Sequence, residues 1–225
     1  MKKIILSSVL GVTTSMSPLL SNASESSSVG VGINYGVFAG PTLELTYPIN
    51  NSLQIRGALS SGMDMSETAT TDIEYQVKTK DGINRLALDY HPFENSFFVS
   101  AGYSVNNFNI EADAEKNGAG ITIGDTTYSG NVVLNGTLNW DNAPSLSFGW
   151  GNSPEKGWGG LIELGAIFTG AADVNITGTG TLNGNDVSTD PAIQAEITKE
   201  EKKVQDELSD YDFLPILQAG VTYRF

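Results

Sequence analysis

Leu217-Gln-Ala-Gly-Val-Thr-Tyr-Arg-Phe225, the last nine residues of the chain, alternate between apolar side chains and polar or small ones. A period of two is typical of a β-strand, because successive side chains of a strand point to opposite faces. One face of this strand therefore meets apolar surroundings, and the other meets polar surroundings.

The same alternation recurs upstream, in runs separated by Gly, Asn, Asp, Ser and Pro. With the last strand, these runs predict eight strands, over residues 29–37, 42–47, 53–59, 73–90, 97–106, 132–151, 161–168 and 217–225. Apart from a short first connection near residue 40, short connections near 50, 93 and 154 alternate with long loops near 68, 120 and 190. This asymmetry predicts an eight-stranded antiparallel transmembrane β-barrel of a Gram-negative outer membrane, with its long loops outside the cell.

The N-terminus has the order of a signal peptide. Lys2 and Lys3 precede an apolar run over residues 4–12, and small residues follow up to Ala23. We expect cleavage after residue 23 and a single outer-membrane barrel domain over residues 24–225. A buried helix or a membrane anchor is the alternative, but Pro18 interrupts the segment, and its apolar run is shorter than the ~20 residues of a spanning helix.

The faces opposite the apolar ones carry six charged residues. In a membrane barrel these point into the lumen, and they form the predicted lumen charge cluster of Glu44, Arg56, Arg85, Asp89, Glu163 and Arg224. The interior of an eight-stranded barrel is just wide enough for side chains to fill it. Two interpretations stay open: a salt-bridged plug, or a polar path whose charges can part.

Aromatic side chains gather near the predicted strand ends, as in the two interfacial girdles of membrane barrels. The predicted membrane-anchoring aromatics at the periplasmic ends include Tyr47, Tyr90, Trp150, Trp158 and Phe225. Phe38, Phe108, Trp140, Phe168 and Phe213 fall near the outer ends. A soluble lipocalin-like barrel is the alternative, and it would turn its apolar faces inward.

The last long loop contains a helical pattern over residues 191–209. Asp190 is a suitable N-cap and Pro191 suits the first helical position. Its apolar residues form one stripe, whereas its many charged residues occupy the rest. We interpret it as a solvated helix against the barrel rim, and a partner-binding helix is the alternative.

The sequence offers little support for catalysis. The single histidine, His91, falls at a predicted periplasmic turn, away from the outer rim where a lipid-modifying barrel would need a base. We therefore predict no catalytic residues, no metal site and no cofactor. The formal net charge of −14 becomes −16 when Lys2 and Lys3 are removed, which argues against nucleic acid as a partner.

Three stretches resemble the CarO-type ornithine-uptake porin family. They are residues 141–149, residues 158–170 with the acidic helix that follows, and residues 211–225. The resemblance implies an eight-stranded outer-membrane barrel associated with passage of small basic amino acids. The expected partners are thus outer-membrane lipid, lipopolysaccharide and small cationic solutes.

Two functions are compatible with these features. The first is a channel-like barrel that passes or binds small basic solutes such as ornithine. The second is a non-transporting structural or adhesive barrel that acts through its acidic external loops. A lipid-modifying enzyme is a third, weaker class, since no base is placed for it.

The C-terminal strand also predicts contact with the barrel assembly machinery, because Phe225 ends an alternating strand as assembly signals do in the proteins this chain resembles. Deletion of Phe225 is expected to reduce assembly more than export. Outer-membrane levels and heat-modifiable migration measure assembly, and levels equal to the parent would count against this role.

Overall fold

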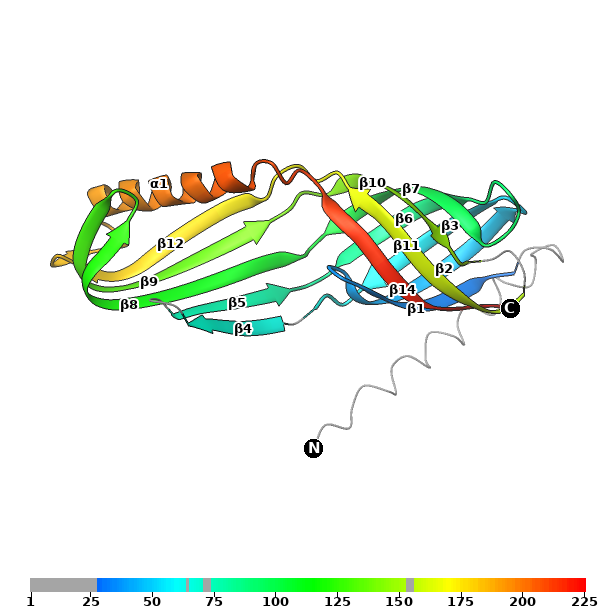
Figure 1. Cartoon of the computed structure of the whole chain (residues 1–225), viewed down its shortest axis with the longest axis horizontal. Helices are drawn as coiled ribbons and strands as arrows, with labels where there is room; N and C mark the ends of the chain where they lie inside the picture. The colour runs from blue at the N-terminus through cyan, green and yellow to red at the C-terminus, as the bar shows by residue number, and fades with distance from the viewer. Residues whose placement is uncertain (1–27, 64, 71–73, 153–155) are drawn as a thin grey trace, which may run out of the picture.

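The structure is a computed structural model that describes residues 28–63, 65–70, 74–152 and 156–225. Eight strands close into an antiparallel barrel in the order β1-β14-β11-β10-β7-β6-β3-β2 (Figure 1). They are β1 (Gly30–Gly36), β2 (Gly40–Asn50), β3 (Leu53–Ser60), β6 (Ile83–Tyr90), β7 (Phe97–Asn106), β10 (Ala143–Trp150), β11 (Gly157–Ile167) and β14 (Leu214–Arg224). The predicted fold class is confirmed, whereas the predicted signal peptide lies outside the described residues.

The outer surface of the barrel is apolar. In β14, Leu217 and Val221 are 49% and 53% exposed, whereas Gln218 and Thr222 are 4% and 7% exposed. The same alternation runs through β2 and β10. The barrel therefore turns its apolar faces outward, as membrane-spanning barrels do, and the lipocalin-like alternative is wrong.

A second sheet extends the barrel at one end (Figure 1). This outer sheet has six strands in the order β13-β12-β9-β8-β5-β4. Its strands are β4 (Met65–Thr70), β5 (Glu74–Lys80), β8 (Asn109–Ile123), β9 (Thr126–Asn139), β12 (Asp173–Leu182) and β13 (Asn185–Asp186). The long loops predicted near residues 68, 120 and 190 are thus corrected, because they contain β4, β8 and β12, which pair within the outer sheet.

Short interruptions between consecutive strands separate the outer sheet from the barrel. The predicted strand over 73–90 is in fact β5 and β6, divided at Asp81 and Gly82, where Asp81 has a φ of 58°. The predicted strand over 132–151 is β9 and β10, divided at residues 140–142. At each break the chain leaves the closed barrel and pairs with strands of the outer sheet instead. A tight turn at Gly124 and Asp125 joins β8 to β9, next to the pairing of Ile123 with Thr126.

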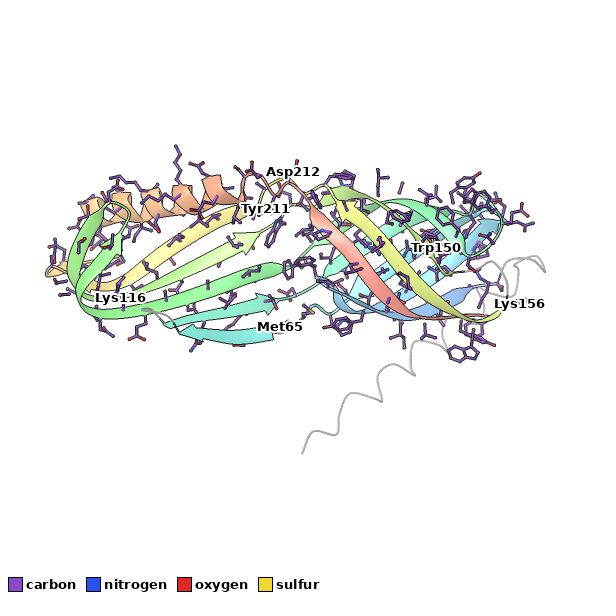
Figure 2. All side chains as sticks on the ribbon, in the orientation of Figure 1. Met65, Lys116, Trp150, Lys156, Tyr211 and Asp212 are labelled. Atoms are coloured by element: carbon purple, nitrogen blue, oxygen red, sulfur yellow. The ribbon has the colours of Figure 1, made fainter. Side chains whose placement is uncertain are left out.

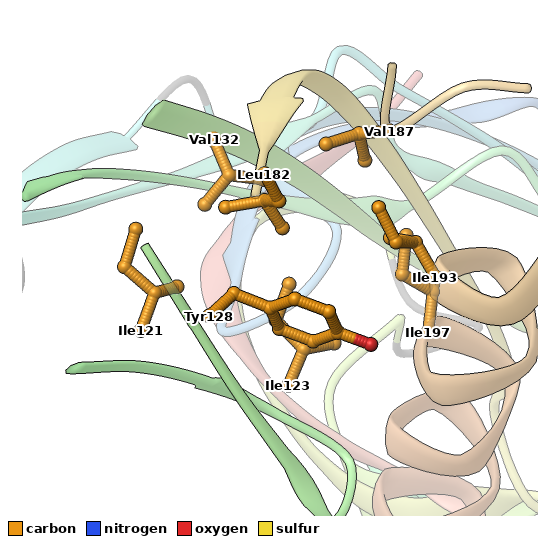
Figure 3. Close-up of a cluster of buried hydrophobic side chains, with 8 residues drawn as sticks. All are labelled: Ile121, Ile123, Tyr128, Val132, Leu182, Val187, Ile193 and Ile197. Carbon is orange, nitrogen blue, oxygen red and sulfur yellow. The ribbon is translucent and has the colours of Figure 1, made fainter. Parts of the chain in front are cut away.

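The predicted helix is present as α1 (Pro191–Leu208), and the Asp190 side chain accepts hydrogen bonds from the backbone N–H groups of Ala192 and Ile193. The described residues contain no helix long and apolar enough to cross a membrane. The helix packs on the outer sheet rather than on the barrel rim, which corrects the predicted position. Ile193 and Ile197 enter the cluster of Figure 3, with Ile121, Ile123, Tyr128, Val132, Leu182 and Val187.

Polar contacts tie α1 to the tip of the β8–β9 hairpin. Lys199 Nζ lies 3.3 Å from Asp125 Oδ2 and 2.8 Å from Glu196 Oε1. The hydrogen bonds from Lys199 lower the pKa of both carboxyl groups, so each stays ionised to a lower pH than it would without Lys199. The helix and the hairpin therefore form one packed unit.

Candidate functional site

The inward faces of the barrel strands bring charged side chains to its centre. Alternation along each strand points Glu44 of β2, Arg56 of β3, Arg85 and Asp89 of β6, and Glu163 of β11 inward. These five residues form the central charge cluster, and all but Arg85 are at most 1% exposed. Salt bridges connect all five side chains.

Arg56 is the centre of the cluster. Its Nη1 donates to Glu44 Oε1 at 3.1 Å and to Glu163 Oε2 at 2.5 Å. Its Nη2 donates to Asp89 Oδ1 at 3.0 Å, Glu163 Oε1 at 3.0 Å and Ser100 Oγ at 3.3 Å. The Arg56 guanidinium thus bridges three carboxylates from three strands, which its planar fork of donors suits.

Aromatic contact supports the same guanidinium. The Arg56 Cζ atom lies 5.1 Å from the centroid of the Phe98 ring, within the range of a cation–π interaction. Phe98 is fully buried in the lumen. Gly149 makes room for it, since a Cβ there would lie 2.8 Å from the Phe98 ring. Hydrogen bonds therefore hold the edge of the Arg56 guanidinium, and the Phe98 ring packs against it.

Glu163 accepts from more side chains than any other carboxylate of the cluster. Arg85 binds it in a bidentate pair, with both N–O distances at 2.9 Å. Ser147 Oγ and Gln218 Nε2 also donate to it, at 2.5 Å each. Such charge-assisted contacts compensate for the high cost of burying a carboxylate.

The central charge cluster has more acid than base. Its three carboxylates face two guanidinium groups, which leaves a formal charge of −1. Among the described residues, Glu44 Oε2 and both polar atoms of the Asn34 amide are buried without a hydrogen-bond partner. Both side chains lie beside Gly32, where an added Cβ would be 3.5 Å from Glu44 Cβ and 3.6 Å from Asn34 Nδ2. Unsatisfied buried polar atoms are rare, and Glu44 Oε2 is one acceptor atom of the cluster that no donor in the described part of the chain uses.

Arg224 lies apart from the central charge cluster. It donates to the Ser28 carbonyl at 2.9 Å, to Gln54 Oε1 at 2.6 Å and to the Asn152 carbonyl at 3.3 Å. Gln54 Nε2 in turn donates to Asp89 Oδ2 at 3.4 Å. The structure thus brings five of the six predicted charges together, and Arg224 reaches them through Gln54.

His91 belongs to this second network. Its Nδ1 lies 2.7 Å from the Asn95 carbonyl, which fixes Nδ1 as the donor, so Nε2 accepts from Gln54 Nε2 at 3.0 Å. The residue is 2% exposed. His91 therefore secures a turn, and no group of described His, Asp or Glu residues is arranged to hold a metal ion.

An apolar layer closes the barrel toward the outer sheet. It consists of the buried residues Ile83, Phe108, Ala143, Ile167, Leu214 and Ile216. Phe108 stacks on Trp140 with centroids 5.4 Å apart, and Phe38 meets Phe108 edge-on at 5.5 Å. The prediction that Phe38, Phe108 and Trp140 belong to an outer lipid-facing girdle is wrong, because all three pack in this layer.

Small cavities flank the central charge cluster. One of about 20 Å³ lies below the apolar layer and is lined by Phe38, Ile83, Arg85 and Gln218. Another of about 20 Å³ lies at the opposite end, against Thr46, Asn152 and Arg224. Each has room for about one water molecule, and they share no lining residue. The lumen is therefore closed in this conformation.

The five predicted membrane-anchoring aromatics lie on the outside of the barrel, at 46% to 81% exposure. They are Tyr47, Tyr90, Trp150, Trp158 and Phe225. Phe97 packs on Trp150 with centroids 5.3 Å apart, and Tyr223 packs on Trp158 at 5.1 Å. Exposed aromatic pairs near the ends with short turns fit an interfacial position.

Neutral residues that the sequence pattern did not single out complete the site. They are Asn34, Gln54, Phe98, Ser100, Ser147 and Gln218. All but Phe98 are polar residues at inward positions of barrel strands, and that periodicity was a usable signal. Phe98 had no such signal, because a large aromatic at an inward position breaks the alternation.

Comparison with known proteins finds two crystal structures from Acinetobacter baumannii that span almost the whole chain. CarO2 has a TM-score of 0.58 and 20% identity, over 88% of this chain and 98% of that one. CarO has a TM-score of 0.54 and 22% identity, over 87% and 97%. The chain has the CarO fold. No family model and no curated protein matches it. A closed barrel with an apolar exterior is the architecture of an outer-membrane protein.

Removal of Arg56 tests whether the central charge cluster is dry. Arg56→Met leaves three carboxylates against Arg85 alone, so we expect a loss of about 3–5 kcal/mol in the free energy of unfolding. The double variant Arg56→Met/Asp89→Asn restores the formal charge of the parent and should recover part of that loss. Urea unfolding in lipid vesicles measures both variants. A single variant as stable as the parent would indicate a wet interior.

Proposed function

We propose that the chain is a Gram-negative outer-membrane barrel that admits small basic solutes, such as ornithine, through an interior that is closed at rest. The observation that carries this proposal is the excess of carboxylate in the central charge cluster, together with the unpartnered Glu44 Oε2. A cationic group entering the lumen would find a buried negative charge and an acceptor atom. An anion would add to the excess of negative charge in the cluster and would compete with Glu163 for Arg85.

Arg85 is the residue that a solute from outside would meet first. It lines the cavity below the apolar layer and is 8% exposed, compared with 1% for Arg56. A solute ammonium or guanidinium group can take the place of Arg85 on Glu163, because one cation then replaces another. Such an exchange keeps Glu163 paired, and the charge that loses its partner is Arg85, the more exposed of the two arginines.

Acids outside the barrel support a preference for cations. The segment from β13 through α1 carries many carboxylates, and several of them, such as Asp190 and Glu207, have no ion pair among the described residues. Their field raises the local concentration of positive solutes near the outer sheet, and salt weakens it. Others, such as Asp113 with Lys78, are neutralised locally.

A non-transporting barrel is the second candidate. The apolar layer around Phe108 favours it, since a solute would have to displace packed aromatic rings as well as ion pairs. In that case the barrel anchors the outer sheet in a membrane of lipid and lipopolysaccharide. Both candidates include assembly through β14 by the barrel assembly machinery, and we propose a catalytic step for neither.

Liposome swelling with purified protein separates the two candidates. We expect ornithine and arginine to enter faster than glutamate by about tenfold, equivalent to about 1.4 kcal/mol, and the difference to shrink at high salt. Glu44→Gln keeps the size of the side chain and its Oε1 acceptor but removes the charge, so it should reduce the preference. Equal rates for both classes, or no swelling with any solute, would contradict transport and favour the second candidate.

A further inference from the structure

The outer sheet contains a groove that no barrel strand lines. One face of β8, β9 and β12 is apolar because the pairing places Ala112 beside Gly136 and Gly136 beside Ile176. This face and one side of α1 line a groove of about 320 Å³. Ile110 lies at its end near the barrel, and Ile121 and Ile123 lie at its far end.

Hydrogen bonding explains why α1 leaves this face uncovered. Gln205 Oε1 accepts from the backbone N–H of Val174 at 3.0 Å, and Glu201 Oε2 accepts from that of Ile176 at 3.0 Å. These contacts fix the helix along the exposed edge of β12, where its side chains satisfy strand N–H groups. The middle of the apolar face, over β8 and β9, stays open.

The hairpin tip forms the far wall. Gly118 and Gly120 adopt φ values of 107° and 79°, which other residues rarely reach, and the strand pairing shifts between Ala119 and Ile121. Beyond this bend the backbone N–H of Gly124 donates to Glu200 Oε2 of α1 at 3.2 Å. The bent tip and the helix therefore enclose the groove on two sides.

Membrane lipid does not cover this groove. The opposite face of β8 carries Glu111 and Asp113, which pair with Lys80 at 2.7 Å and Lys78 at 3.3 Å. Ionised side chains at such positions are incompatible with the hydrocarbon of a bilayer. The apolar surface thus lies in water, where burial against a ligand is favourable at about 25 cal/mol per Å².

The positive charge of Lys116 favours an anionic ligand. It lines the groove on the same face as Ala112 and lies toward the end of the outer sheet that is far from the barrel (Figure 2). In the described part of the chain no carboxylate pairs with it, whereas Glu200, on the opposite wall, is 3.7 Å from Lys203. From Lys116 to Ile110 the strand rises about 20 Å, the length of an extended alkyl chain.

We propose that this groove binds an anionic amphiphile with a single alkyl chain, its head group at Lys116 and its chain along β8 and β9 toward Ile110. The floor of Ala112, Ala114 and Gly136 suits a narrow, unbranched chain. This binding is independent of solute passage through the barrel, since the groove shares no residue with the central charge cluster.

Photo-crosslinking of the full-length protein in lipid nanodiscs tests the proposal. Dodecanoate with a terminal diazirine is added, and labelled peptides are identified by mass spectrometry. The probe also partitions into the bilayer, so labelling of the outer face of the barrel serves as an internal reference. We expect saturable labelling within residues 109–139, which unlabelled dodecanoate abolishes and dodecyltrimethylammonium does not.

Gly136→Phe is the blocking variant. A Cβ at Gly136 would meet only the Ala112 carbonyl oxygen, at 3.7 Å, so a ring can enter the groove without a backbone clash. Saturable labelling should disappear while labelling of the barrel stays unchanged. Asn175→Phe is the matched control, because residue 175 points to the opposite face of the same sheet, and it should label like the parent.

Lys116→Gln tests the head group without adding bulk. Half-saturation should rise about fivefold, and Lys116→Arg should restore it. Labelling of residues 109–139 that never saturates, that survives Gly136→Phe, or that the cationic amphiphile displaces equally well would overturn the proposal. So would a dimer whose contact fills the groove, because a second copy would then be the occupant.

Discussion

The pairing of Arg56 with Glu44, Asp89 and Glu163 is the contact on which the barrel depends. An eight-stranded barrel has an interior that side chains must fill, and filling it with charges requires that each be paired. The chain has three arginines, Arg56, Arg85 and Arg224, and all three point into the lumen. The structure therefore concentrates its strongest hydrogen-bond donors where carboxylates would otherwise be unpaired. A closed lumen follows from this pairing.

Because the lumen is closed, molecules outside the barrel contact the outer sheet and α1 rather than the barrel interior. The central charge cluster and the apolar layer around Phe108 both block the barrel, whereas the outer sheet and α1 add a folded surface beyond it. Passage of a basic solute requires exchange of ion pairs at Glu163, and binding in the groove beside Lys116 requires no change in the barrel. The two sites are thus separate in both chemistry and position.

The sequence predicted the barrel well because each of its strands separates an apolar from a polar face. Val221 and Thr222 illustrate this, and their faces are as expected. β4, β8 and β12 were taken for loops, and β5 and β9 were joined to the barrel strands β6 and β10, since alanine, glycine and threonine give the outer sheet a weak alternation. Strand pairing at long sequence distance, such as β5 with β8, has no local signal. For the same reason the sequence placed Arg224 with the other charges, although its side chain hydrogen-bonds to Gln54 instead.

Deuterium exchange of the Arg56 Nε–H tests most directly whether the central charge cluster is dry and closed. With three arginines in the chain, the Nε–H signals are few enough to assign in a nitrogen-15 NMR spectrum of the protein in lipid nanodiscs. A dry, closed cluster predicts that the Nε–H of Arg56 exchanges with deuterium on the order of minutes to hours, because exchange then requires opening of the structure. Exchange of this proton as fast as that of a free arginine in water would contradict a paired, water-free plug.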